Sequence, residues 1–247
     1  MTRIAPALAT VVALALTACA DPATETRIAD LETQVKTLNE KVTALETRAP
    51  GKAAAADPAA EQAAGELLRQ ANDLAMALKY DEAKAKIAEL KSKYGATRAA
   101  RSSGRLESEL AVVGVDAGEL EVASWFQGNG NMNDGKATLL VFWETWCPHC
   151  RREVPKVQAT YEKYNAKGLN LVALTKVTKS ATDDGVAEFI KENNLTYPVA
   201  KEQDGSLSSR FGVRGIPAAA VVQNGKVVWR GHPARLTDQM IEGWLNS

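Results

Sequence analysis

Cysteine and histidine are scarce in this chain of 247 residues, which carries three cysteines and two histidines. Lys plus Arg equal Asp plus Glu at 30 each, so the formal net charge is zero. A neutral chain offers no electrostatic case for binding nucleic acid or an acidic membrane surface. A methionine-rich stretch is also missing, since the whole chain has four methionines. Partners must therefore be inferred from local sites.

The first residues predict an export signal. Arg3 precedes an apolar run over residues 4–16, which is shorter than the ~20 residues that a membrane-spanning helix needs. The tetrapeptide Leu-Thr-Ala-Cys at 16–19 resembles the bacterial lipoprotein box. The resemblance implies that residues 1–18 are a lipoprotein signal peptide and that Cys19 becomes diacylglyceryl-modified. An ordinary signal peptide is the alternative, and it would leave an orphan thiol in an exported protein.

Export bears on both location and redox chemistry. We expect a lipid-anchored protein that faces the periplasm or the cell exterior. Ala20 stands where an aspartate would resemble the inner-membrane retention signal of Gram-negative lipoproteins, so the outer membrane is favoured. Because the periplasm is kept oxidising, a dithiol there must be actively reduced before it can act as a reductant.

Residues 19–49 are predicted to hold the lipid anchor and a coiled coil. The apolar residues follow a strict three-four alternation, with β-branched residues at the a positions and leucine at the d positions, a pattern that favours parallel dimers. A trimer, or an amphipathic helix lying on the membrane or folding back on the protein, remains open. The seam comprises Ile28, Leu31, Val35, Leu38, Val42 and Leu45.

A second helical unit is predicted over residues 65–113, after an alanine-rich stretch over residues 50–64 that is a linker or, with Asp57-Pro58 inside it, a poorly packed helix start. It resembles a single tetratricopeptide-type hairpin. One such repeat buries its apolar face poorly alone, so the unit could be a spacer, a dimerisation element or a peptide-binding surface. The expected first face is Leu67, Leu68, Ala71, Leu74, Ala75 and Leu78, the second is Ala83, Ile87 and Leu90, and a third helix spans 96–110.

The sequence Cys147-Pro148-His149-Cys150 follows an apolar run at 139–143 and predicts a dithiol site where a strand gives way to a helix. Unpaired N–H groups and the dipole at a helix N-terminus stabilise a thiolate. Cys147 is therefore the expected nucleophile, and Cys150, one turn into the helix, the buried resolving thiol. His149 should lower the pKa of Cys147. A structural zinc site would need four ligands, hence both histidines, and no metal is expected.

Short apolar strands alternate with helical stretches from residue 115 to residue 247, which indicates an α/β domain. Asn224-Gly225 is a strong signal for a two-residue hairpin. The expected helices span about 148–167, 183–194, 207–211 and 237–245. The expected strands are Leu120–Ala123, Thr138–Trp143, Leu169–Thr175, Tyr197–Ala200, Ala218–Gln223 and Lys226–Trp229.

Two motifs in this domain carry a family resemblance. Phe142-Trp143-Glu144-Thr145-Trp146 leads into the cysteines, and Gly215-Ile216-Pro217 follows later in the chain. In this order the motifs resemble those of the TlpA/ResA-like exported thioredoxins. The resemblance implies a thioredoxin fold, thiol–disulfide exchange with protein substrates, and no cofactor beyond the Cys147–Cys150 pair. It also implies a cis Pro217 opposite the cysteines, with Trp146, Ile216 and Pro217 docking the substrate.

One departure from the thioredoxin pattern concerns proton transfer. Thioredoxins carry a buried aspartate one residue before the Phe-Trp pair, and this chain has Val141 there. Glu144 and Lys176 are the titratable residues that could replace it, although each could equally be a solvated or capping residue.

Three matters stay open at this level. The Pro148-His149 dipeptide is also that of the oxidising DsbA family, so the direction of electron flow is undetermined. The helical unit could be a binding scaffold with an accessory thioredoxin domain. Metal delivery through Cys147, Cys150 and a histidine is a further hypothesis.

Overall fold

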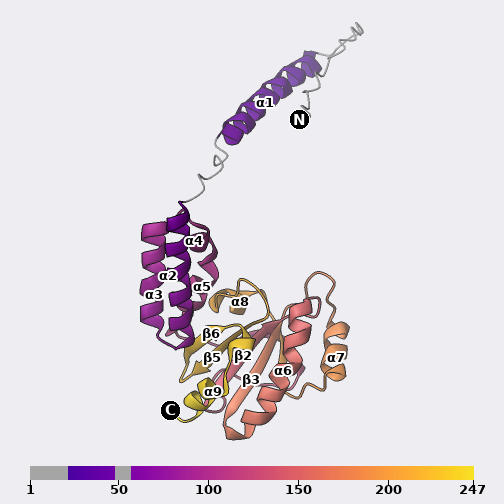
Figure 1. Cartoon of the computed structure of the whole chain (residues 1–247). Helices are drawn as coiled ribbons and strands as arrows, with labels where there is room; N and C mark the ends of the chain where they lie inside the picture. Colours follow the sequence, from indigo (N-terminus) through magenta and orange to yellow (C-terminus); the bar gives the residue numbers. More distant parts are fainter. Residues whose placement is uncertain (1–21, 48–56) are drawn as a thin grey trace, which may run out of the picture. The chain divides into compact units, whose positions relative to one another are not determined.

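The computed structural model describes residues 22–47 and 57–247 (Figure 1). The predicted signal peptide, Cys19 and the N-terminal part of the predicted linker lie outside the described residues. The chain divides into two compact units, residues 1–54 and residues 55–247, which are described separately.

The first unit contains one described helix, α1 (Pro22–Thr47). It covers the predicted seam, so the helical part of that prediction is confirmed. Ile28, Leu31, Val35 and Leu38 are exposed along α1. The side chains of α1 after residue 40 are not described. Pairing of α1 with a second copy stays a prediction.

The second unit begins with a helical module made of α2 (Pro58–Met76), α3 (Tyr80–Tyr94), α4 (Arg98–Ser102) and α5 (Gly104–Val112). Of the two alternatives for residues 50–64, the structure shows a helix start in the C-terminal part, because α2 begins at Pro58. Asp57 caps this helix by accepting a hydrogen bond from the Ala59 N–H, and Pro58 occupies the first turn. Asp-Pro is therefore a helix start here, since proline lacks only an N–H that would be unpaired there anyway.

The module buries the faces that the sequence predicts, with two corrections. Ala71, Ala83 and other predicted residues form its core. Leu78 does not belong to the α2 face, because it lies in the following turn with a φ of 60° and is exposed. The predicted third helix is interrupted between α4 and α5, where the Ser103 hydroxyl donates to the Ala100 carbonyl at 2.8 Å.

The rest of the unit is a twisted α/β domain. In the described residues its strands form one six-stranded sheet in the order β1-β4-β3-β2-β5-β6. Parallel pairing joins β2 to β3 and β3 to β4, and the remaining neighbours are antiparallel. The strands are β1 (Val122–Gln127), β2 (Ala137–Trp143), β3 (Leu169–Thr175), β4 (Val199–Glu202), β5 (Ala218–Gln223) and β6 (Lys226–Gly231).

Central strand β2 is buried on both faces, which is why its sequence is a continuous apolar run. Leu139, Val141 and Trp143 pack in one core, which α6, α7 and α9 complete. Leu140 and Phe142 pack in the other core with α8. The helices are α6 (Pro148–Tyr164), α7 (Asp183–Glu192), α8 (Ser206–Arg210) and α9 (Asp238–Leu245), with short 3₁₀ turns η1 (Asn165–Lys167) and η2 (Pro233–Arg235).

The predicted elements of this domain are present, with shifted ends. The Asn224-Gly225 hairpin is confirmed, with positive φ values of 50° and 73° at its two residues. The edge strand β1 differs most, because it runs to Gln127 and pairs with β4 far along the chain. Edge strands need only one partner, so their ends depend on tertiary pairing more than on local pattern.

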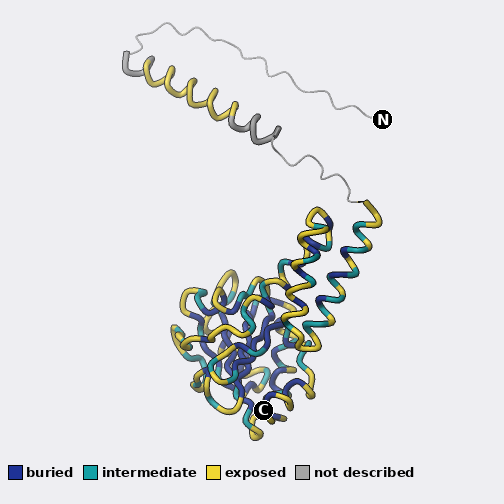
Figure 2. Tube along the Cα trace, turned by 90° about the vertical axis from the view of Figure 1, so that its left-hand side faces the viewer, coloured by how far each residue is buried: buried dark blue, intermediate teal, exposed yellow. Residues whose placement is uncertain are grey.

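Helix α5 packs against β6, which joins the helical module to the sheet domain. The Tyr80 hydroxyl donates to the Val228 carbonyl at 3.0 Å. The loop after α8 passes close to α5, since a Cβ added at Gly212 would meet the Ser108 carbonyl oxygen at 2.9 Å. Figure 2 shows the buried segments concentrated in the sheet domain and continuing into the module. The module is therefore part of the same compact unit as the sheet.

Candidate dithiol active site

The two cysteines of the predicted site lie at the N-terminus of α6, directly after β2. Cys147 is the N-cap residue and Pro148 opens the helix. The Cys147 N–H donates to the Glu144 carbonyl at 3.2 Å, and its own carbonyl accepts from the Arg151 N–H at 3.1 Å. The turn between strand and helix is thus closed on both sides of Cys147. Both cysteines are free thiols.

The Gly215–Pro217 segment lies beside Cys147, although it is distant in the sequence. The Ile216–Pro217 peptide bond is cis, as expected. The Cys147 Sγ lies 3.8 Å from the Ile216 carbonyl oxygen, to which the thiol donates. Cys147, Ile216 and Pro217 therefore form one site.

Burial distinguishes the thiols only slightly, since Cys147 is 5% exposed and Cys150 is 0% exposed. Burial raises the pKa of the Cys150 thiol far above its usual value, and the neighbouring Cys147 thiol adds to the rise. The expectation of a buried inner thiol is confirmed. Because Cys150 is held protonated, it can attack a disulfide only after losing a proton to a nearby base.

Glu144 is the nearest candidate for that base. Its side chain is buried and accepts hydrogen bonds from the Trp146 indole N–H and the Thr178 hydroxyl, both at 2.6 Å. Its charge also acts on the Cys150 thiol. Thr178 was not identified in the sequence, because nothing in the local pattern around it indicates a contact with Glu144. A buried carboxylate in this position can hold or release a proton next to the thiol pair.

Lys176, the other candidate for a substitute base, is paired with a carboxylate. Its Nζ is 3.8 Å from Glu202 Oε2, and Glu202 also accepts from the Ser208 hydroxyl at 2.6 Å. Lys176 and Glu202 line a cavity of about 160 Å³ that Glu144, Trp146 and Ile216 also line. Lys176 is therefore at the edge of the dithiol site, where it lines this cavity.

The two tryptophans of the motif differ in burial: one lies in the core and the other at the surface of the site. Trp143 is buried against Phe189, with ring centroids 5.1 Å apart, and Arg151 lies over the same Phe189 ring. Trp146 is half-buried, and the Lys179 ammonium lies over its ring, 3.3 Å from the ring centroid. Trp146 therefore forms the accessible wall of the site.

His149 is exposed and its Nδ1 lies 2.7 Å from an Arg152 guanidinium nitrogen. This contact places two cation-capable groups on the first turn of α6. The other histidine, His232, lies across the Gly215–Pro217 segment in a separate cavity. Within residues 22–47 and 57–247, no group of three or more His, Cys, Asp or Glu side chains is arranged to hold a metal ion.

A group of arginines near this loop was missed by the sequence reasoning. Arg105, Arg214 and Arg230 line one cavity beside Ile216 and Pro217. They come from α5, the loop after α8 and β6. No spacing rule could have grouped them, because their proximity depends on the packing of the module on the sheet.

The sheet domain is similar in sequence to known proteins. Residues 129–242 match the Redoxin family. The chain is 28% identical over 112 residues to sporulation thiol-disulfide oxidoreductase A of Bacillus subtilis, covering 45% of this chain and 68% of the relative. It is 36% identical over 95 residues to thiol-disulfide oxidoreductase ResA of Bacillus thuringiensis, covering 38% of this chain and 53% of the relative. Among solved structures, StoA from Bacillus subtilis aligns over 52% of this chain and 96% of its own, with 25% identity and a TM-score of 0.44.

The Redoxin match and these relatives, which are named as thiol-disulfide oxidoreductases, define the sheet domain as a thioredoxin-like thiol–disulfide oxidoreductase. More particularly, it is similar to the ResA and StoA oxidoreductases, which confirms the ResA-like resemblance seen in the motifs. The helical module and α1 lie outside the Redoxin match.

Proposed function

We propose that this chain is a membrane-tethered enzyme that exchanges disulfides with exported proteins through Cys147 and Cys150. The observation that carries the proposal is the position of the Cys147 thiol, at a helix N-terminus and 3.8 Å from the carbonyl oxygen beside a cis proline. The helix N-terminus favours the thiolate. Pro217 has no N–H to offer, so the backbone at Ile216 is the part available to pair with a substrate strand.

In the reductive direction, the Cys147 thiolate attacks one sulfur of a substrate disulfide. A mixed disulfide forms, and the other substrate sulfur leaves as a thiolate that takes up a proton. Cys150 then loses its proton to Glu144 and attacks the Cys147 sulfur. The substrate leaves as a dithiol, and the enzyme pair is oxidised to a disulfide. The reverse sequence oxidises a substrate dithiol and leaves the enzyme reduced.

Two variants test these roles. Replacing Cys147 with serine should abolish exchange with a protein disulfide, whereas Cys150→Ser should accumulate mixed disulfides that gel electrophoresis without reductant detects. Full activity in the Cys147 variant would contradict the proposal. Lys226→Gln, which alters an exposed residue on the β5–β6 hairpin, is the matched control and should keep full activity.

The direction of electron flow follows from the reduction potential of the Cys147–Cys150 pair, measured in glutathione buffers. A potential of about −120 mV would match the oxidant DsbA, and one of about −270 mV would match thioredoxin. A cation near a cysteine thiolate stabilises the reduced pair and raises its potential, and His149 lies with Arg152 on the first turn of α6. Replacing His149 with alanine should therefore lower the potential.

The proposed architecture places this domain at the end of a tether. Residues 1–18 are the signal peptide, residues 19–49 the lipid anchor and coiled coil, and residues 58–112 the helical module before the thioredoxin domain at 115–247. Within the described residues, no helix is both long and apolar enough to span a membrane. Anchoring at the outer membrane is tested by replacing Cys19 with serine, which should release the protein from membrane fractions.

Self-association through α1 completes the proposal. Ile28, Leu31, Val35 and Leu38 are large apolar residues left exposed on one helix, and a second copy presenting the same seam would cover them. Replacing Leu31 and Leu38 with lysine should convert a parallel dimer to a monomer in sedimentation experiments. A protein that is monomeric before the substitutions would contradict this part.

A further inference from the structure

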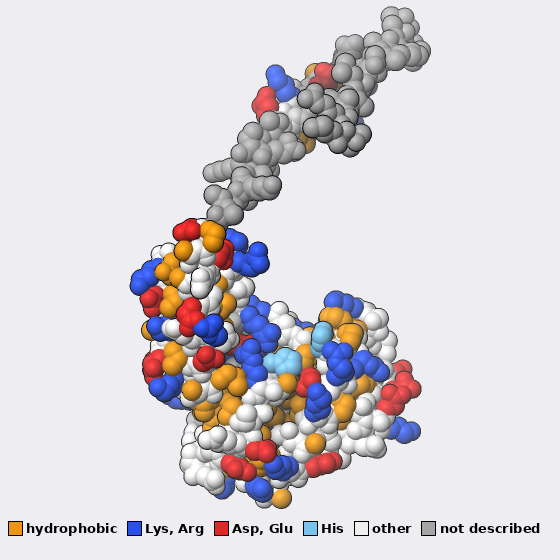
Figure 3. All heavy atoms as spheres, in the orientation of Figure 1, with side chains coloured by type: hydrophobic (Ala, Val, Ile, Leu, Met, Phe, Trp, Pro, Cys, Tyr) orange, Lys and Arg blue, Asp and Glu red, His pale blue; other side chains and the backbone are white. Residues whose placement is uncertain are grey.

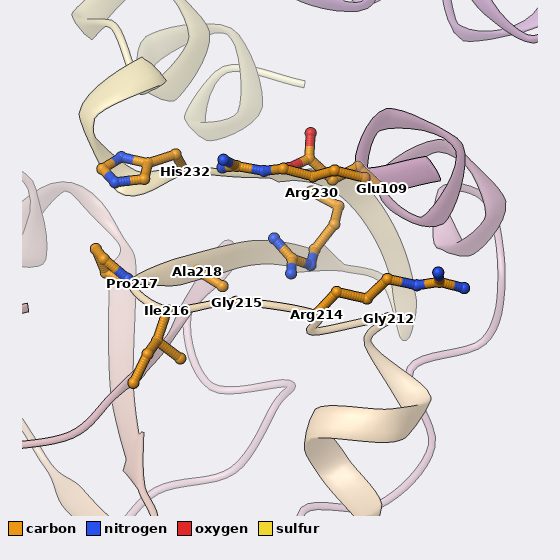
Figure 4. A pocket seen from close by; sticks show the side chains of 10 residues that line it. Glu109, Gly212, Arg214, Gly215, Ile216, Pro217, Ala218, Arg230 and His232 are labelled. Atoms are coloured by element: carbon orange, nitrogen blue, oxygen red, sulfur yellow. The ribbon is translucent and has the colours of Figure 1, made fainter. Parts of the chain in front are cut away.

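A second cavity adjoins the dithiol site on the other side of the Gly215–Pro217 segment. Its volume is about 160 Å³ (Figure 4). The helical module and the sheet domain both contribute to its walls. The residues that matter for its chemistry are Arg105 and Glu109 from α5, Arg214 and Ile216 from the loop before β5, and Arg230 and His232 from the end of β6.

The cavity has more positive than negative charge. Glu109 is buried, but Arg105 Nε at 3.0 Å and Arg235 at 3.3 Å already bind its two carboxylate oxygens. Arg214 is exposed on the rim. Figure 3 shows Lys and Arg side chains gathered where the module meets the sheet domain, next to histidine. A cavity of this kind raises the local concentration of anions.

Arg230 is the buried cation of this group, with 7% of its surface exposed. Its guanidinium donates to the carbonyls of Phe211 at 2.8 Å and Gly231 at 2.8 Å. Among the described residues, no carboxylate lies within ion-pair distance of it. Burial lowers the pKa of Arg230 to about 10, so it stays charged at neutral pH. In Figure 4 the side chain points from β6 toward the loop that holds Arg214 and Ile216.

His232 can add a neutral donor. Burial lowers the pKa of His232, which favours the neutral ring at pH 7. Its Nδ1 accepts from the Ala234 N–H at 3.1 Å. The proton of the neutral ring is therefore on Nε2, where it can be donated.

The cavity shares a wall with a cavity at the site of thiol exchange. Gly215 and Ile216 line both this cavity and the one that contains Glu144 and Trp146. The Ile216 carbonyl is also the group that faces the Cys147 thiol. A chain that engages Cys147 and the Ile216 backbone therefore passes the rim of the arginine-lined cavity.

We propose that this cavity binds the carboxylate of an aspartate or glutamate that lies close in sequence to the reactive cysteine of a protein substrate. The inference rests on the proposed function and deepens it, because it names the substrates as proteins with an acidic residue beside the cysteine. Guanidinium groups match a carboxylate in charge and planar geometry. The helical module thereby acquires a role, since α5 supplies one wall of the site.

The test uses the full chain and pairs of disulfide-linked peptides. The two members of a pair differ only in having Glu or Gln at one position beside the cystine, and each flanking position is examined in turn. We expect kcat/KM to be about tenfold higher for Glu than for Gln at one position or at adjacent positions, the effect of one charge-assisted hydrogen bond. The preference should shrink as salt rises, because ions screen the charges.

Variants and a neutral substrate separate this inference from the proposed function. Arg105→Gln and Arg214→Gln should each reduce the ratio of kcat/KM for the Glu peptide to kcat/KM for the Gln peptide to less than about half of the wild-type ratio. The control Lys226→Gln should leave this ratio unchanged. Equal kcat/KM values for the Glu and Gln peptides at every position would overturn the inference. Inhibition by inorganic phosphate without any preference for Glu over Gln would also overturn it, because it would indicate a site for small anions. Failure of the wild-type protein to exchange with either uncharged hydroxyethyl disulfide or its reduced form, mercaptoethanol, would instead overturn the proposed function.

Discussion

Raising the pH should destabilise the reduced protein through Cys150, and the structure fixes the sign of the effect. The thiol is completely buried, and burial raises its pKa. In the unfolded chain its pKa is about 8.5. Between that value and the folded pKa, the unfolded chain has lost a proton that the folded protein keeps. The stabilisation is therefore fully present below about pH 8.5 and is lost as the pH rises.

The size of the loss follows from the same linkage. If the folded thiol is still protonated at pH 10, the unfolded state gains RT ln(1 + 10^1.5), which is about 2 kcal/mol. This is a large share of the ~5–15 kcal/mol that stabilises a typical domain.

Urea unfolding at pH 7 and pH 10 measures the effect. The comparison is between Cys147→Ala and the double variant Cys147→Ala/Cys150→Ala, since neither protein can form the disulfide. Burial also raises the pKa of Tyr80 and Tyr197, but both proteins contain these residues and their contributions cancel. We expect the single variant to lose about 2 kcal/mol more than the double variant over this pH range.

Equal losses in the two proteins would refute the reasoning. They would mean that the Cys150 thiol ionises in the folded protein as readily as in the unfolded chain. In that case Cys150 could attack without a proton acceptor, and Glu144 would have no part in the second step of exchange.

Three further predictions concern single residues. Replacing Glu144 with glutamine should slow the release of the mixed disulfide by about 100-fold, as quenched-flow trapping would measure; an unchanged rate would exclude Glu144 as the base. Leu90→Ala should cost about 2–5 kcal/mol in urea unfolding, because Leu90 is fully buried between the module helices; a loss below about 1 kcal/mol would contradict that packing. Tyr80→Phe should cost about 1 kcal/mol, since the Val228 carbonyl loses its donor, and a neutral result would mean that water replaces the hydroxyl.

The parts of the fold that the sequence predicted are those governed by local chemistry. The run of apolar residues in β2 ends at Trp143, shortly before the cysteines, and a helix begins at Pro148, which suits its first turn. The Asn224-Gly225 hairpin is likewise a property of two residues. Such features need no knowledge of what packs around them.

The parts that the sequence did not predict depend on distant neighbours. The ends of β1 are set by its pairing with β4. The contact of Thr178 with Glu144 requires the loop after β3 to fold back over the site. Arg105 and Arg230 are on different elements, joined only because α5 packs on β6. Neither periodicity nor motif spacing contains this information.

This division also separates two properties of the site. In the proposed function, exchange chemistry depends on groups at the strand–helix turn and at Pro217, which a short motif can specify. Selectivity depends on the walls around Ile216, and these differ in origin: Trp146 and Lys176 come from the sheet domain, whereas Arg105 comes from the helical module. The wall of the arginine-lined cavity that α5 supplies lies outside the Redoxin match, because that match begins at residue 129. We therefore expect a thioredoxin-like domain without such a module to perform the same exchange without the proposed preference for acidic substrates.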